Sequence, residues 1–204
     1  MIKQKRKALA MTQTHDDFKT YLITVINDKE LTHLVPEILN TFNQMQLSKN
    51  ELFVTEGAIS TYFCYIQKGI LQHSLNILGE EKTTYLALKN SCTTALNSFK
   101  NKVPSRKNIK AVTDCTLQVI TIQDFEYLMQ HNQAFHTFYY HLIENQIYKI
   151  DDHRIDLLTL SPEERYQKLL QNEPILLQKV PLHYLSSFLG ISLRHMSRIR
   201  KNIK

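Results

Sequence analysis

Five basic side chains near the end of the chain are the clearest indication of the chemistry that it can perform. Lys or Arg stands at positions 194, 198, 200, 201 and 204, and no Asp or Glu lies between residues 194 and 204. Their ammonium and guanidinium groups can neutralise phosphates, and Arg can also bond the edge of a guanine. On a helix, one face of this segment would carry Leu193, Arg194, Ser197, Arg198 and Lys201. The pattern indicates a surface that contacts the backbone and base edges of duplex DNA.

Two short helices joined by a sharp turn are the elements that would position these side chains. The first has an apolar face, and Gly190 can end it because glycine tolerates a positive φ. Ser192 can cap the second helix, whose apolar positions recur at three- and four-residue steps. The first apolar face holds Leu182, Leu185, Phe188 and Leu189, and the second holds Met196, Ile199 and Ile203. This is a helix-turn-helix pattern, with a recognition helix over about residues 192–203. The candidate DNA-binding residues are Ser192, Leu193, Arg194, Ser197, Arg198 and Lys201.

The charge of the chain is unevenly distributed. The net charge is +6, residues 1–12 carry +4, and residues 161–204 carry eight basic and three acidic residues, or +5. The remainder is therefore 6 − 4 − 5 = −3. A basic C-terminal unit on a mildly acidic body suits a nucleic-acid-binding module joined to a sensing or dimerising one.

The rest of the composition excludes several classes of protein. No apolar run reaches membrane-spanning length, and the basic first residues are not followed by an apolar signal core, so we expect a cytoplasmic protein. Cys64, Cys92 and Cys115 are widely spaced, which argues against a disulfide framework or a metal site. We expect Cys64 and Cys115 in strands and Cys92 in a polar loop. No cofactor or metal is predicted.

The middle of the chain changes its apolar period from helical to strand-like. Two helical patterns lie within residues 15–44, and short runs from about residue 45 to 122 alternate with a period of two. The segment from Leu78 to Lys82 is a hairpin signal, and many short strands in succession predict a sandwich or barrel. A helix from Ile122 to His131 is expected to follow.

A long helix over residues 133–159 carries two apolar stripes. Phe135, Phe138 and Leu142 can cover the barrel. A second stripe, at steps of four, three, four and three, forms a heptad seam that we expect to meet a second copy of the chain. An intramolecular core helix is the alternative. The predicted seam comprises Ile143, Ile147, Ile150, Arg154 and Leu157. After it, Ser161, Pro162 and Glu164 predict a capped helix that Pro174 ends.

The order of these elements resembles the Crp/Fnr transcription regulators, and particularly their short members from Bacteroidetes-type bacteria. Local strings that support the resemblance include Tyr65-Ile-Gln-Lys-Gly69, Ser161-Pro-Glu-Glu-Arg-Tyr166 and Ser197-Arg-Ile-Arg-Lys201. The resemblance implies an α+β chain with a jelly-roll-like β-roll of the cyclic-nucleotide-binding type, a dimerisation helix and a winged-helix-like helix-turn-helix domain. The expected partners are double-stranded DNA and a second copy of the chain, with RNA polymerase as a further candidate and the effector unknown. The expected parts are a basic extension (1–14), sensor (15–132), dimerisation helix (133–159) and DNA-binding domain (160–204).

The residues that distinguish members of this family differ here. Arg198 falls where the family places an arginine for DNA contact, but Leu193 and Arg194 replace its usual Arg-Glu pair. In the cyclic-nucleotide cassette a Glu takes the ribose and an Arg the phosphate, whereas residues 91–107 contain no acid and no glycine. Cyclic AMP is therefore not expected to bind. The candidate ligand pocket comprises Cys92, Thr93, Ser105 and Arg106.

Two other classes of function remain open on the sequence alone. The basic tail could contact an acidic protein, in a ligand-binding or interaction module without DNA affinity. A cupin-like enzyme is the weaker alternative, because the chain has no HxH pair of metal ligands and no GxSxG, Walker or GxGxxG motif. We therefore predict that the chain is not an enzyme.

Overall fold

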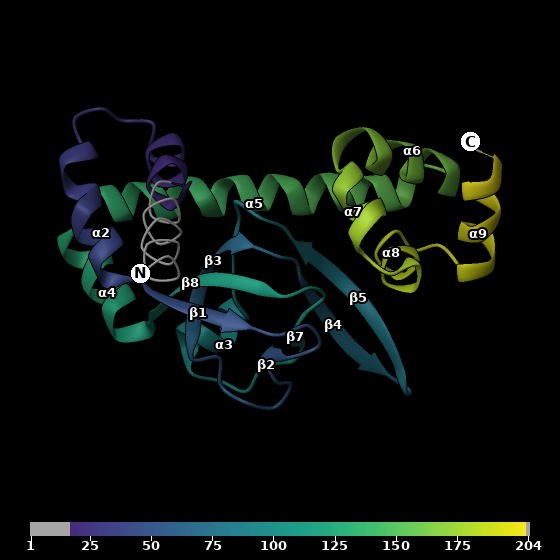
Figure 1. Cartoon of the computed structure of the whole chain (residues 1–204), viewed down its shortest axis with the longest axis horizontal. Coiled ribbons are helices and arrows are strands. Elements are labelled where there is room, and N and C mark those ends of the chain that lie inside the picture. Colours follow the sequence, from purple (N-terminus) through teal and green to yellow (C-terminus); the bar gives the residue numbers. More distant parts are fainter. Residues whose placement is uncertain (1–16, 203–204) are drawn as a thin grey trace, which may run out of the picture.

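A long helix, α5 (Gln133–Thr159), runs along the length of the molecule, with a β-roll on one side of it (Figure 1). The computed structural model describes residues 17–202. The predicted basic extension (1–14) and the apolar position Ile203 lie outside the described residues. Helices α2 and α4 lie at one end of α5, and α6, α7, α8 and α9 lie at the other (Figure 1).

The N-terminal helices pack on the roll and on the first part of α5. Residues 17–26 are helical, and a 3-10 turn (Thr32–Leu34) leads into α2 (Val35–Thr41). Phe18, Leu22 and Ile26 are buried at steps of four, as the helical pattern predicts. Their core also contains Phe135 and Phe138 of α5, so the prediction that these two aromatics cover the roll is confirmed.

The roll consists of two four-stranded antiparallel sheets. The first has the order β1-β8-β3-β6 and the second β2-β7-β4-β5. The strand bounds are β1 (Asn43–Leu47), β2 (Leu52–Val54), β3 (Tyr62–Lys68), β4 (Leu71–Ile77), β5 (Glu80–Ala87), β6 (Cys92–Thr93), β7 (Asn108–Ala111) and β8 (Cys115–Thr121).

The predicted hairpin joins β4 to β5. Its turn is Leu78-Gly79, both with positive φ, which is the backbone that a two-residue hairpin needs. Three elements of the roll have no strong sequence pattern: the two-residue β6, the four-residue β7 and the short helix α3 (Leu96–Asn101). The expectation that Cys92 lies in a polar loop is wrong, because it is in β6 and is buried in the aromatic core next to Tyr65.

The helices after the roll follow the predicted boundaries. Helix α4 spans Ile122–His131, and α5 spans Gln133–Thr159. The next helix, α6 (Pro162–Asn172), begins with the predicted capping box, in which Ser161 and Glu164 bond each other's backbone N–H groups.

The helices after α5, which we call the C-terminal domain, differ from the expectation between α6 and α8. Helix α6 ends just before Pro174, as predicted, but Pro174 also begins a further helix, α7 (Pro174–Lys179), which was not predicted. Proline fits the first turn of a helix. Residues 160–202 contain no strand, so the wing that the resemblance implies is not present in the described part of the domain. The last two helices are α8 (Leu182–Phe188) and α9 (Leu193–Asn202).

Candidate nucleic-acid interface

A short, sharp turn joins α8 to α9. Gly190 has a φ of +64°, and the next N–H, of Ile191, donates a 2.8 Å hydrogen bond to the carbonyl of Ser186. A Cβ at Gly190 would lie 3.2 Å from Leu157 of α5, so the turn packs closely against the end of the long helix. These contacts fix the point at which α9 begins.

Helix α9 divides into a buried and an exposed face. Ser192 accepts a 3.3 Å hydrogen bond from the N–H of His195, which confirms it as the cap. Met196 and Ile199 are buried in the core of the C-terminal domain, as their spacing predicts. The same phase leaves Arg194 and Arg198 exposed.

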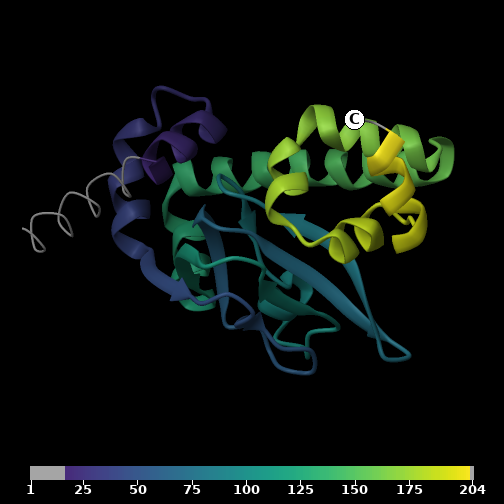
Figure 2. The ribbon, with the colours of Figure 1, turned by 45° about the vertical axis from the view of Figure 1, so that its right-hand side comes forward.

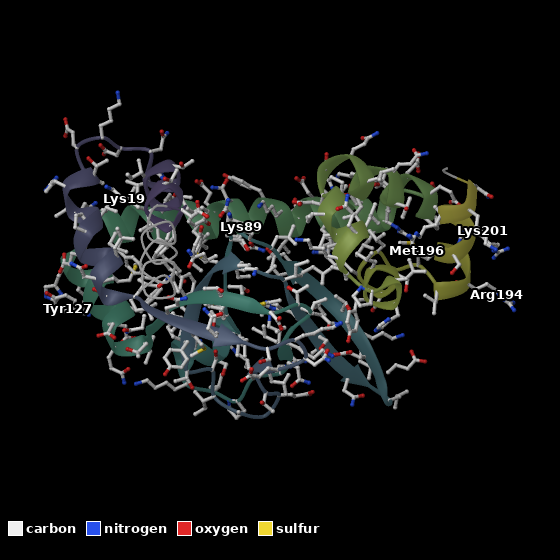
Figure 3. All side chains as sticks on the ribbon, in the orientation of Figure 1. Lys19, Lys89, Tyr127, Arg194, Met196 and Lys201 are labelled. Carbon is white, nitrogen blue, oxygen red and sulfur yellow. The ribbon has the colours of Figure 1, made fainter. Side chains whose placement is uncertain are left out.

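The exposed face is cationic and apolar, and it lies at the far end of the molecule. Leu193 is 50% exposed, and the side chains of Arg194 and Lys201 extend away from the body (Figure 3). Within residues 17–202, no carboxylate forms an ion pair with Arg194, Arg198 or Lys201. An exposed, mainly cationic face attracts an anionic surface.

Two contacts of α9 involve residues at or beside the predicted DNA-binding face. The hydroxyl of Ser197 donates a 3.0 Å hydrogen bond to the carbonyl of Leu193, so its donor is used inside the helix. His195 lies 2.9 Å through Nε2 from a carboxylate oxygen of Glu163, at the start of α6. Neither residue of this pair was predicted for the site, because the two positions are far apart in sequence and carry no shared motif.

The four residues of the candidate ligand pocket are not brought together. Cys92 faces the aromatic core, whereas the hydroxyl of Thr93 lies inside the roll, 2.7 Å from Nε2 of His73. Ser105 and Arg106 line a shallow groove of about 480 Å³ beside Gly57 and the end of β4. Adjacent strand residues point to opposite faces, which separates Cys92 from Thr93.

Side chains contact one another across the interior of the roll. His73 is buried, its ring meets Tyr85 edge-on at 5.3 Å, and the Tyr85 hydroxyl lies 3.5 Å from the side-chain oxygen of Gln146 on α5. Burial lowers the pKa of His73 well below its usual value, and nearby Lys107 acts in the same direction. His73 is therefore a neutral, packed residue of the roll.

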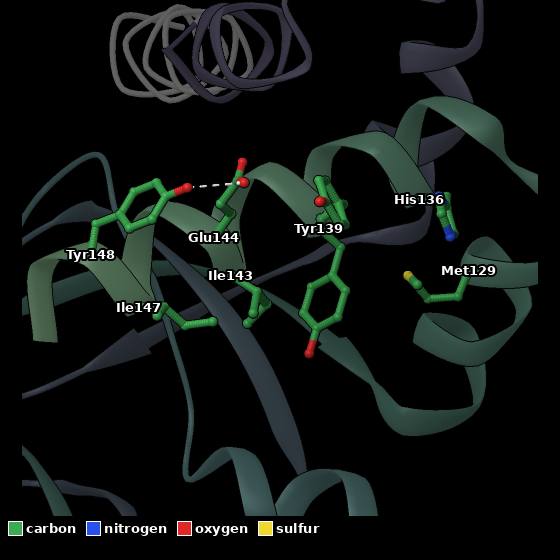
Figure 4. Close-up of a pocket in the computed structure, with 8 residues that line it drawn as sticks. Met129, His136, Tyr139, Ile143, Glu144, Ile147 and Tyr148 are labelled. Carbon is green, nitrogen blue, oxygen red and sulfur yellow. Dashed lines mark hydrogen bonds between the residues drawn. The ribbon is translucent and has the colours of Figure 1, made fainter. Parts of the chain in front are cut away.

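The predicted seam of α5 is largely uncovered in the single chain. Ile147 and Ile150 are 58% and 59% exposed, while Ile143 is half-buried. Side chains of α4 and α5 line a groove of about 540 Å³ beside the first part of this seam, including Met129, Tyr139 and Ile143 (Figure 4). The exposed apolar face of α5 is wider than the predicted stripe. Four exposed residues that were not predicted for the seam add to it: Tyr140, Tyr148, Ile155 and Leu158.

Cys64, Cys92 and Cys115 are free and buried, and burial raises the pKa of each thiol. Among residues 17–202, no group of three or more His, Cys, Asp and Glu side chains could hold a metal ion. No helix in the same range has the length and hydropathy that a membrane crossing requires.

Comparison with known proteins defines the fold of the roll. Residues 44–132 match the family model of the cyclic nucleotide-binding domain. A comparison with curated protein sequences finds no match.

Several solved structures share the arrangement over most of the chain. FixK2 from Bradyrhizobium japonicum superposes with a TM-score of 0.67 at 14% identity, covering 79% of this chain and 84% of its own. The c-di-GMP-responsive global regulator CLP of Xanthomonas campestris gives 0.66 at 14% identity, covering 84% and 90%. A putative transcriptional regulator of the Crp/Fnr family from Eubacterium rectale gives 0.63 at 14% identity, covering 86% and 82%. The chain therefore has a cyclic-nucleotide-binding β-roll of two antiparallel sheets followed by helices, the fold of Crp/Fnr regulators.

Proposed function

We propose that the chain is a dimeric, DNA-binding transcription regulator of the Crp/Fnr type, with α9 as its recognition helix. The observation that carries the proposal is the face of Arg194, Arg198 and Lys201, exposed at the distal end of the molecule and without carboxylate partners among the described residues. In a helix-turn-helix the second helix enters the major groove, where Arg can bond a guanine through two atoms. The closer likeness to short Bacteroidetes-type members stays a hypothesis.

The dimer of this proposal forms along α5. Its exposed isoleucines leave an apolar strip that water would otherwise cover, and two such helices side by side bury it. Because α9 lies beyond one end of α5, two parallel copies would present both recognition helices at the same end (Figure 1). Half-sites one DNA turn apart, roughly 34 Å, are the spacing such a pair fits.

The roll of this proposal is not a cyclic AMP receptor of the usual kind. The segment from Ser91 to Lys107 contains no carboxylate to accept the ribose hydroxyls. The hydroxyl of Thr93 bonds His73 inside the roll, whereas Arg106 lines the groove beside Gly57. Titration calorimetry with cyclic AMP should therefore detect no stoichiometric binding. A tight one-to-one isotherm would contradict this part of the proposal.

The decisive experiment is selection of bound duplexes from a random DNA library, followed by anisotropy titration of the best duplex and a scrambled one. Arg198→Ala should cost about 1–3 kcal/mol on the selected duplex and relax its sequence preference. Lys19→Ala is the matched control, because Lys19 is an exposed cation at the opposite end of the molecule (Figure 3). Failure to enrich any duplex would remove DNA as the partner and favour a protein partner for the basic face.

A further inference from the structure

The outer face of the second sheet is covered by the C-terminal domain of the same chain. Gln72 and Ser74 of β4 point away from the roll interior, since their neighbours Leu71 and His73 point into it. Side chains on the outer face of a sheet are normally exposed to solvent, yet Gln72 and Ser74 are 0% and 1% exposed. Helix α8 contacts β5 on this side, and the views of Figures 1 and 2 both place the domain there.

Polar contacts tie α8 to this face. The backbone N–H of Thr83 in β5 donates a 2.8 Å hydrogen bond to the hydroxyl of Ser187 in α8. The ammonium of Lys110 in β7 lies 5.1 Å from the ring centroid of Tyr184 and bonds Glu81 at 2.8 Å. Such a cation held by a carboxylate and an aromatic face favours one orientation of the helix that carries the ring.

An apolar core continues across the same boundary. Ile70, Leu86 and Val112 of the roll region belong to one buried cluster with residues of α6, α7, α8 and α9. The cluster includes Leu185 of α8 and Met196 of α9. The recognition helix therefore packs in a core that the sensor roll helps to build, and it cannot turn independently of the roll without exposing apolar surface.

The C-terminal domain is also fastened to the end of α5. Phe188 of α8 stacks on His153 at 4.6 Å with ring planes 7° apart. Lys168 of α6 pairs with Asp156 at 2.6 Å, and Arg165 donates a 3.0 Å hydrogen bond to the carbonyl of Leu157. The domain thus has two supports, the roll and the long helix.

We infer that the contact between α8 and the outer face of the second sheet holds the recognition helix in its DNA-competent position. Ser187 and Tyr184 are then positioning residues, because they act through α9 and touch no DNA themselves. The inference rests on the proposed function. It is favoured over an inhibitory contact because docking uses the side of the domain away from Arg194 and Lys201, which stay exposed while the domain is docked.

The inference predicts how loosening the contact changes DNA binding. A domain that spends time undocked no longer holds two recognition helices at one separation. The apparent affinity for the selected duplex then equals the affinity of the docked state multiplied by the docked fraction. Affinity for scrambled DNA depends on charge and should not change. Loss of specificity without loss of non-specific affinity is therefore the expected signature.

A reversible cross-link tests the inference directly. Thr83→Cys/Ser187→Cys places thiols on two residues that are joined by the hydrogen bond from the Thr83 backbone N–H to the Ser187 hydroxyl, and the native cysteines are buried. We expect the disulfide to form under mild oxidation and to be seen by peptide mass mapping. The oxidised protein should bind the selected duplex as tightly as the wild type, within about twofold, and the reduced form should bind roughly three- to tenfold less tightly.

Each outcome has a distinct meaning. Loss of binding on oxidation alone would overturn the inference, because the docked state would then be inactive. Absence of the cross-link, together with unchanged binding of the selected duplex by the Lys110→Met variant described below, would reject the docked arrangement itself. A disulfide that forms in a protein with no duplex affinity in either state, wild type included, would instead reject the proposed function.

A second pair of variants covers a failure of the cysteine protein to fold. Lys110→Met removes the cation over Tyr184 and should weaken binding to the selected duplex by roughly two- to fivefold. Lys82→Met is the control, since Lys82 pairs with exposed Glu80 on the same hairpin. If Lys110→Met and Lys82→Met weakened binding equally, and did so for the selected and the scrambled duplex alike, the effect would be one of charge only. That result would contradict a positioning role.

Discussion

Nε2 of His195 in α9 lies 2.9 Å from a carboxylate oxygen of Glu163 at the start of α6. The pKa of Glu163 is held below its ordinary value of 4.5, first by a hydrogen bond from its own backbone N–H and then by His195 and Arg198. The pair links the first turns of two helices of the C-terminal domain.

The lowered pKa of Glu163 gives a pH-dependent stability. The folded state prefers the charged carboxylate, so its stabilisation is present above about pH 4.5 and is lost as the pH falls through the lowered pKa. In thermal melts, Glu163→Gln should flatten the loss of stability below about pH 4.5 relative to the wild type. Glu56→Gln is the control, because no described residue bonds its carboxylate; equal flattening by both would contradict the assignment.

Lys201 should act on DNA through charge alone. It lies two turns or so beyond Arg194 on the exposed face, where a flexible ammonium suits phosphate better than a base edge. Lys201→Ala should weaken selected and scrambled duplexes alike and lower the slope of log affinity against log salt by about one unit. Titrations at four salt concentrations measure this, and a change confined to the selected duplex would place Lys201 on a base.

Ile147 should be essential to the dimer. In Ile147→Asp a carboxylate would enter the apolar interface between two α5 helices, at a cost on the order of 2–4 kcal/mol. Sedimentation velocity should show dimers for the wild type and monomers for the variant at low micromolar concentration. Ile77→Asp is the control, because Ile77 is exposed to a similar degree, 49%, on the β4–β5 hairpin. A dimeric Ile147→Asp protein would reject the seam.

Gly69, between β3 and β4, should tolerate no side chain. Its φ is +100°, and a Cβ there would lie 2.4 Å from the sulfur of Cys115 and 2.7 Å from the carbonyl oxygen of Asp114. Gly69→Ala should lower the free energy of unfolding by about 2–5 kcal/mol, combining backbone strain with overpacking. Gly57→Ala, with φ +83° but open space, should cost only about 1–2 kcal/mol. Urea titrations compare them, and equal losses would mean that contact with Cys115 is unimportant.

Most helices of the fold could be predicted from the sequence because they have their own local signals, whereas the six-residue helices α3 and α7 could not. Apolar residues at three- and four-residue steps predict α4, α5, α8 and α9, and Ser161 with Glu164 predicts the start of α6. The buried face of α9 follows from the same period, since Met196 and Ile199 fix its phase.

The parts that could not be predicted depend on contacts distant in sequence. Strand β6 exists because Cys92 and Thr93 pair with Tyr65 and Cys64, and two residues are too few to show a period. The same pairing buries Cys92 and points its side chain away from that of Thr93. The four residues predicted for the ligand pocket therefore do not all lie together. The His195–Glu163 contact and the docking of Ser187 on Thr83 join elements whose sequences carry no common pattern.

Because Gly190 lies so close to Leu157, the residue at each of these positions limits which residues the other can hold. A larger residue at 190 would displace Leu157, and a different residue at 157 would alter both the turn and the strip on α5. Among natural variants of this chain, changes at the two sites should be epistatic, with one tolerated only in the presence of the other. Sequence change along the exposed apolar face of α5 is thereby restrained by the turn before α9.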